Sequence, residues 1–172
     1  MNVRDALRTR TSPAHDALDS RMSPLDLSTS AGLRTFLTIS AAGWSLLSSV
    51  GPAATALSEM REALSADLRA MGEGAPSVPA VRPARHPLAG AYLVLGSRLG
   101  LALLARRFPA APARRYVGLP PRGADWRALC ATLSAMPADS AEGYAVVADA
   151  CAHFEDWSGI AASCMGEVAD VA

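Results

Sequence analysis

Apolar residues recur at steps of three and four along most of this 172-residue chain. This periodicity is typical of amphipathic helices. Alternating runs of β-branched residues are nearly absent, and alanine, the strongest helix former, occupies about a fifth of the positions. The sequence therefore predicts an all-α fold, in the form of a helical bundle.

The length and the 51% hydrophobic content suit one domain with a full core. We predict a single domain over residues 1–172, with long proline- and glycine-rich loops at 72–87 and 109–123 and a flexible tail at 163–172. Gly72 is expected to cap the third helix. Helices are predicted over residues 3–21, with Pro13 as a kink or restart, and over residues 31–50, 53–71, 88–108, 124–136 and 139–162.

Three cysteines without C-x-x-C spacing favour reduced thiols over a disulfide framework. The N-terminus lacks an apolar signal region, and no uninterrupted apolar run approaches the roughly 20 residues that span a bilayer. We therefore expect a cytoplasmic protein with neither a membrane nor a nucleic acid as its partner. All 16 basic residues are arginine, so lysine chemistry such as Schiff-base formation is excluded.

The net charge of zero hides an asymmetry along the chain. Residues 1–127 carry a net charge of +7 and residues 128–172 a net charge of −7. The basic part is suited to an anionic ligand or an acidic partner. Alternatively, folding brings the two parts together into a mixed surface, and charge alone does not decide between these interpretations.

The three histidines differ in their surroundings. His86, in the proline-rich loop, is expected to be solvated. His153 has Asp149 four residues before it and Asp156 three residues after it, which predicts an exposed, charge-paired helix face.

His15 lies four residues before Asp19, one helical turn apart. The Asp19 carboxylate is then positioned to accept the Nδ1 proton, which leaves Nε2 available to bind a metal. An exposed surface pair is the alternative, and the spacing alone favours it.

Gly96 and Gly100 lie on one face of the hydrophobic helix at 88–108. Without side chains there, a flat ligand or a neighbouring helix can approach the backbone closely. Taken by itself, the pattern is more typical of helix packing.

Taken together, five elements change this interpretation: LRTRTSPAHDALDS (7–20), REALSADLRAMG (61–72), AYLVLGSRLGLALLARRF (91–108), Trp126 and ACAHFEDW (150–157). In content, order and spacing they resemble the bacterial biliverdin-producing heme oxygenases, over nearly the whole chain. The resemblance implies heme b held between a proximal and a distal helix. It also implies the oxidative opening of heme to biliverdin, carbon monoxide and ferrous iron.

The resemblance also assigns site residues. It makes His15 the proximal iron ligand, with Asp19 as its orienting partner. It makes Gly96 and Gly100 the distal glycines, with Ser97 beside the first. Arginine is a suitable partner for heme propionates, and Arg8 and Arg127 stand where the family places basic residues. Tyr92, one turn before Gly96, is a further candidate for heme binding.

The sequence departs from the family pattern at three positions. Leu101 stands where a second glycine is common and adds bulk to the distal pocket. Leu95 replaces an acidic residue. Asp19 is one methylene shorter than the usual glutamate, which predicts a water-bridged contact with His15.

The leading hypothesis is therefore a heme oxygenase that takes electrons from an external donor such as ferredoxin or a flavin reductase, because no flavin or nucleotide motif occurs in the chain. We expect such an acidic donor to dock on one arginine group: Arg98, Arg106, Arg107, Arg114 and Arg115. The alternatives are a heme-binding protein that does not cleave heme, which Leu101 favours, and a generic helical interaction domain.

Overall fold

The computed structural model describes residues 1–48, 50–74, 85–107 and 113–169. Its elements are α1 (Val3–Met22), α2 (Ser30–Ser45), the short 3-10 turn η1 (Gly51–Ala53), α3 (Ala54–Ala70), α4 (Pro87–Arg107), α5 (Gly123–Ala135) and α6 (Ala141–Ala169). Within these residues there is no strand, only one isolated bridge between Asn2 and Pro137. The predicted all-α class is confirmed.

Some helix ends follow from local chemistry, but α2 ends at Ser45 rather than at the predicted residue 50. The Asn2 side chain accepts the backbone N–H of Asp5 and caps α1, which then continues through Pro13 without a break. Gly72 follows α3 with a φ of 79°, a left-handed conformation suited to glycine. The predicted glycine stop is confirmed, with Met71 as the C-cap residue and Gly72 directly after it.

The C-terminal prediction needs correction. Residues 163–169, expected to belong to a flexible tail, continue α6 as far as Ala169. Cys164 and Met165 are partly buried against the core, which gives this extension a packing reason. Residues 170–172 lie outside the described part of the chain.

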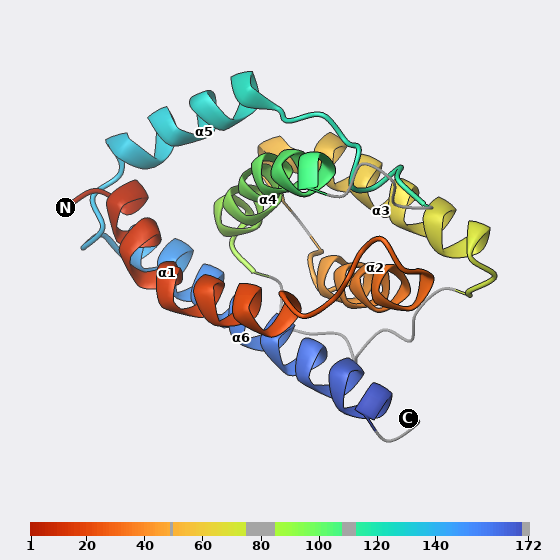
Figure 1. Ribbon diagram of the computed structural model, residues 1–172. Helices are drawn as coiled ribbons and strands as arrows, with labels where there is room; N and C mark the ends of the chain where they lie inside the picture. Colours follow the sequence, from red (N-terminus) through yellow and green to blue (C-terminus); the bar gives the residue numbers. More distant parts are fainter. Residues whose placement is uncertain (49, 75–84, 108–112, 170–172) are drawn as a thin grey trace.

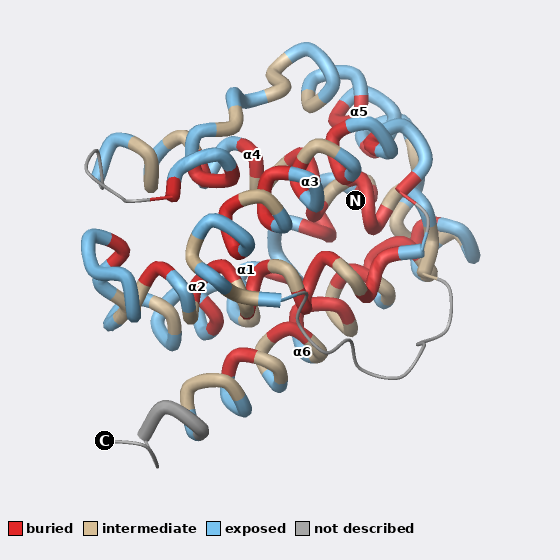
Figure 2. Tube along the Cα trace, turned by 90° about the vertical axis from the view of Figure 1, so that its right-hand side faces the viewer, coloured by how far each residue is buried: buried red, intermediate tan, exposed pale blue. Residues whose placement is uncertain are grey.

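Helix α4 lies among the other helices and packs mainly against η1, α5 and α6. In Figure 1, α1 lies along α6, α5 crosses above α1 and α4, and α2 and α3 form the other side of the molecule. Figure 2 shows the buried residues on the faces that these helices turn toward one another. Trp44 of α2, Leu7 of α1 and Leu64 of α3 are among the fully buried core side chains.

Helix α4 is the hydrophobic helix that the sequence predicts over residues 88–108. Among the described helices, it is the one long and apolar enough to cross a membrane by length and composition, with 44% of its most apolar window buried. It packs against η1, α5 and α6. A helix covered on several sides needs apolar residues around most of its circumference, which accounts for this composition.

Two side chains fasten the segment between α4 and α5. The buried Asp67 carboxylate accepts the backbone N–H groups of Arg115 and Tyr116 at 3.1 and 2.9 Å. The guanidinium of Arg98, which is 1% exposed, donates to the Pro120 carbonyl and to Glu59. Of the loops predicted over 72–87 and 109–123, residues 72–74, 85–86 and 113–122 contain no helix, whereas Pro87 and Gly123 are the first residues of α4 and α5. Residues 75–84 and 109–112 of these loops lie outside the described residues.

Candidate functional site

A cavity of about 460 Å³ lies between the C-terminal halves of α1 and α4. Its volume falls within the usual range of roughly 300–1,000 Å³ for small-molecule pockets. Phe36 from α2, Phe154 and Trp157 from α6, and Tyr116 from the α4–α5 segment also line it. Most of the lining is apolar, so the cavity suits a largely hydrophobic ligand.

The α1 wall carries the histidine–aspartate pair. Nδ1 of His15 lies 3.3 Å from Oδ2 of Asp19 and 3.9 Å from Oδ1 of Asp16. The edge of the His15 ring also meets the ring of Phe154, with centroids 5.6 Å apart. His15 and Asp19 both line the cavity. The predicted pairing is present at direct-contact distance rather than through water, and it leaves Nε2 as the nitrogen available to a metal.

The two predicted glycines of α4 differ in their position relative to the cavity. Ser97, Gly100 and Leu101 line the cavity, and a Cβ added at Gly100 would meet nothing within 4 Å. Gly96 is not among the lining residues, and a Cβ added there would lie 3.7 Å from Trp126. Gly100 therefore borders the cavity, as predicted, whereas Gly96 lies outside the cavity lining and faces Trp126 of α5 at ordinary contact distance.

The three side chains predicted to bind propionates do not line this cavity. Arg8 and Arg127 are exposed, and Tyr92 packs against Trp126 with ring centroids 5.6 Å apart. Burial raises the pKa of Tyr92, although a hydrogen bond with Thr11 partly opposes the shift. Tyr92 therefore joins α4 to α1 and α5.

Two hydroxyl groups of the site were not predicted from the sequence. Ser40 and Tyr116 are both buried and line the cavity. The Tyr116 oxygen accepts a 2.7 Å hydrogen bond from Nε1 of Trp44, and burial raises the Tyr116 pKa to about 12. The hydroxyl thus keeps its own proton at neutral pH. No sequence signal marks these residues, because Tyr116 reaches the cavity only through the loop that Asp67 holds.

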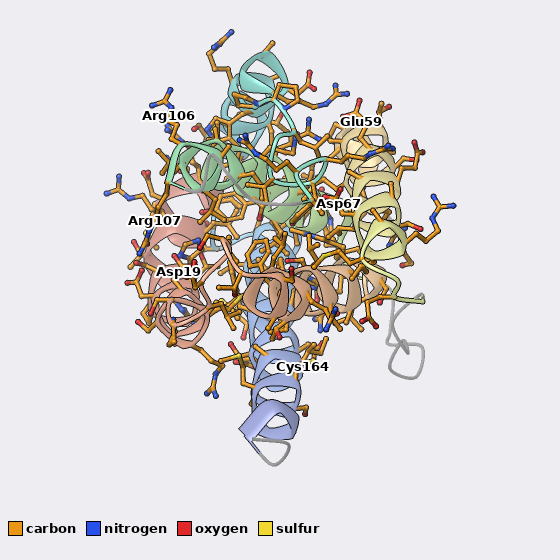
Figure 3. All side chains as sticks on the ribbon, turned by 45° about the vertical axis from the view of Figure 1, so that its right-hand side comes forward. Asp19, Glu59, Asp67, Arg106, Arg107 and Cys164 are labelled. Atoms are coloured by element: carbon orange, nitrogen blue, oxygen red, sulfur yellow. The ribbon has the colours of Figure 1, made fainter. Side chains whose placement is uncertain are left out.

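Arg107 was predicted to belong to the docking surface for an electron donor, yet it lines the cavity. Figure 3 shows it on the same side of the molecule as Asp19, at the end of α4. Arg98 must be removed from the predicted docking group, because its buried guanidinium is held by Glu59 and Pro120. Arg106, Arg114 and Arg115 are exposed, as the prediction requires.

His153 is the clearest correction among the histidines. It is 0% exposed rather than on a charged surface, and neither ring nitrogen has a hydrogen-bond partner. Its ring lies between Trp44 and Trp157, with centroid distances of 6.2 and 5.7 Å. Burial, with a smaller contribution from Arg85, lowers the pKa of His153 to about 4.

His86 and Arg85 connect the basic and acidic parts of the chain. The His86 backbone N–H donates to Asp149, and the Arg85 guanidinium pairs with Asp156 on α6. Nδ1 of His86 accepts the backbone N–H of Leu88, so this histidine is partly structural rather than simply solvated. Folding therefore mixes the two charge blocks at this interface.

No family model matches the chain, and no curated protein matches it in sequence. Among solved structures, it is similar to the NO- and CO-bound heme oxygenase from Neisseria meningitidis, with a TM-score of 0.76 and 18% sequence identity. The match covers 96% of this chain and 93% of the other.

The chain has a heme oxygenase-like fold. Within this heme oxygenase-like fold, the cavity offers one histidine, an apolar slot and an open glycine on the facing helix. No group of three or more His, Cys, Asp or Glu residues that would hold a bare metal ion occurs in the described residues. A single histidine is how heme iron is commonly held from the protein side. The donor set therefore fits an iron porphyrin.

Proposed function

We propose that this protein is a heme oxygenase, which binds heme in the cavity between α1 and α4 and opens its ring to biliverdin, carbon monoxide and ferrous iron. One observation carries the proposal: the His15–Asp19 pair and Gly100 border the same cavity from α1 and α4. A histidine on one wall and a glycine on the other leave room for a flat iron-bearing ligand between two helices.

Asp19 acts on His15 through its Nδ1 proton. A carboxylate 3.3 Å from Nδ1 selects the tautomer that carries its proton there and presents Nε2 as the ligating atom. Heme, when bound, supplies the iron and the oxygen chemistry.

The part of α4 that lines the cavity carries no acidic side chain. Ser97, Gly100 and Leu101 provide one hydroxyl, one bare backbone position and one apolar side chain. Ser40 and Tyr116 add hydroxyl groups that can orient water, and the raised pKa keeps Tyr116 a donor. The proton donors on this side of the cavity are therefore hydroxyl groups, which are weak acids. Weak acids suit oxidation of the porphyrin itself rather than peroxidase-type chemistry.

Hemin titration followed by a time course with reductant and oxygen tests this function. The wild-type protein is expected to give a histidine-ligated Soret band, which then bleaches as biliverdin forms. His15→Ala should weaken the band, and added imidazole should restore it. Absence of hemin binding by the folded wild-type protein would refute the proposal and leave the helical interaction domain as the better description.

A heme-binding protein without cleavage activity is the second candidate. Leu101, 4% exposed, lines the cavity and occupies space on the α4 wall. A Soret band that stays stable with reductant and oxygen would favour this function. In that case, Leu101→Gly should be examined for a gain of bleaching.

The electron supply and the location are further parts of the proposal. We propose an external donor such as ferredoxin or a flavin reductase, docked near the exposed arginines of the α4–α5 region. A cytoplasmic location is part of the proposal and is supported by Cys130, Cys151 and Cys164, which form no disulfide bond within the described residues.

A further inference from the structure

The two residues before α4 lie against a row of acidic side chains on α6. Glu142, Asp149 and Asp156 are seven residues apart, so they share one face of that helix. The Arg85 guanidinium pairs with Asp156. The backbone N–H of His86 donates to Oδ2 of Asp149 at 2.6 Å, and Nε2 of His86 lies 3.7 Å from Oε1 of Glu142. The start of α4 is thereby fastened to α6.

His86 also caps α4. Its Nδ1 accepts the backbone N–H of Leu88 at 3.2 Å, and Pro87 occupies the first helical position, where no N–H needs a partner. An N-cap side chain usually accepts this bond with an oxygen, whereas here the acceptor is a ring nitrogen. Only a histidine with an unprotonated Nδ1 has the required lone pair. The cap therefore needs the neutral ring with its proton on Nε2, the nitrogen nearer to Glu142.

A proton added to Nδ1 reverses the balance of contacts at His86. The ring can then no longer accept the Leu88 N–H, and the helix dipole opposes a cation at the start of a helix. The carboxylate of Glu142, in contrast, attracts the charged ring. Protonation thus favours the contact with α6 at the expense of the cap on α4.

The other charged groups around His86 belong to α6 and to its own segment. Asp149 attracts a protonated ring, and Arg85 repels one while it pairs with Asp156. The turn η1, which meets Pro87 through Gly51, has the sequence Gly-Pro-Ala and carries no titratable side chain. Charged residues of α3 and of the start of α5 pair around Arg98, in the middle of α4: Glu59, Arg122 and Asp125.

We infer that His86 is a pH-sensitive switch at the start of α4. When neutral, it caps the helix through Nδ1, and when protonated, it releases the Leu88 N–H and binds Glu142 on α6. Solvent supplies the proton, since the His86 side chain is 24% exposed. The cavity-lining residues of α4 begin at Ser97, about three turns further along, so the switch does not depend on the proposed function.

Hydrogen exchange of the Leu88 amide, measured by NMR, tests the switch. This N–H has no partner within the helix, because it belongs to the first turn. Its protection factor, the intrinsic exchange rate divided by the observed rate at the same pH, should fall about tenfold between pH 8 and 5, where histidine ordinarily titrates.

His86→Asn is the matched control, because asparagine caps a helix without titrating in this range. Its Leu88 protection factor should stay within about twofold between pH 8 and 5. His153 is present in both proteins, so the comparison isolates the contribution of His86. Circular dichroism at pH 8 should be the same for the variant and the wild type, which shows that the variant is folded.

Nitrogen-15 chemical shifts of the His86 ring provide a second measurement. At pH 8 they should show a proton on Nε2 and none on Nδ1, and at pH 5 both nitrogens should be protonated. Glu142→Gln removes the carboxylate that receives the charged ring, so the midpoint of this change should move to lower pH. Glu155→Gln, which replaces another exposed acid of α6, should leave the midpoint unchanged.

Three results would overturn the switch: a neutral His86 ring with its proton on Nδ1, a Leu88 protection factor that is independent of pH in the wild type, or an equal fall in His86→Asn. The ring measurement uses the wild-type protein, so it remains decisive even if a variant fails to fold. Failure of the protein to bind hemin would contradict the proposed function and leave this inference unaffected.

Discussion

Nε1 of Trp44 donates a 2.7 Å hydrogen bond to the hydroxyl oxygen of Tyr116, which lies 72 residues further along the chain. Both residues are buried, and the bond fastens the α4–α5 segment to α2 beside the cavity. It thus ties the position of a cavity-lining hydroxyl to the central tryptophan of the core.

Tyr116→Phe should therefore destabilise the protein. The substitution leaves the buried Nε1 of Trp44 without an acceptor, at a cost of about 1–3 kcal/mol in the free energy of unfolding. Urea unfolding at pH 7 measures this cost. Tyr144→Phe is the matched control, because Tyr144 is 72% exposed and its substitution should be neutral within about 0.5 kcal/mol. Equal stability of Tyr116→Phe and wild type would show that the bond contributes nothing.

The two glycines of α4 should respond differently to alanine. Gly100→Ala meets open space and replaces a poor helix former, so the ligand-free protein should gain up to about 1 kcal/mol. The added methyl group borders the cavity, and hemin affinity should fall.

Gly96→Ala supplies the matched control, since its Cβ would make an ordinary contact with Trp126. We expect similar or higher stability and unchanged hemin affinity. Thermal melts and hemin titrations of both variants provide the measurements. A larger loss of hemin affinity in Gly96→Ala than in Gly100→Ala would contradict the geometry of this wall.

Acid should destabilise the protein through His153. Its pKa falls from 6.5 to about 4 on folding, so the unfolded chain binds more protons between these values. The stability that neutral, buried His153 retains at pH 7 is lost as the pH falls from about 6.5 toward 4, by up to about 3 kcal/mol.

His153→Phe tests this dependence, because it keeps an aromatic ring between Trp44 and Trp157 and removes the unpartnered nitrogens. Guanidinium unfolding between pH 7 and 4.5 should show a shallower loss of stability than in wild type. Titration of carboxylates changes the stability of both proteins over this pH range. The relevant quantity is therefore the difference between the stability–pH curves of the variant and the wild type. Parallel curves would mean that His153 does not titrate as its burial requires.

Asp67 should be essential for the loop that carries Tyr116. Asp67→Ala leaves the backbone N–H groups of Arg115 and Tyr116 without their acceptor, and we expect a loss of about 3 kcal/mol. Glu62→Ala on the same helix removes an exposed acid and should cost less than about 1 kcal/mol. Chemical denaturation of both variants makes the comparison, and similar losses would rule out a special role for the buried carboxylate.

The all-α class and most helix ends could be predicted because they depend on local properties. Periodicity, the alanine content and the glycine after α3 act within one or two turns of the chain. The tail at 163–169 was mispredicted because its helix is supported by packing of Cys164 and Met165 against distant residues. The spacing of residues along the sequence gives no indication of this contact.

The same distinction between local sequence and tertiary packing applies to the candidate site. By itself, the sequence determined the His15–Asp19 pair, because residues four apart on a helix are neighbours whatever surrounds them. Only the tertiary structure decided that Gly100 rather than Gly96 borders the cavity, that His153 is buried between two tryptophans, and that Arg107 rather than Arg8 reaches the site. Those facts depend on which helix packs against which face, and packing joins residues far apart in the chain.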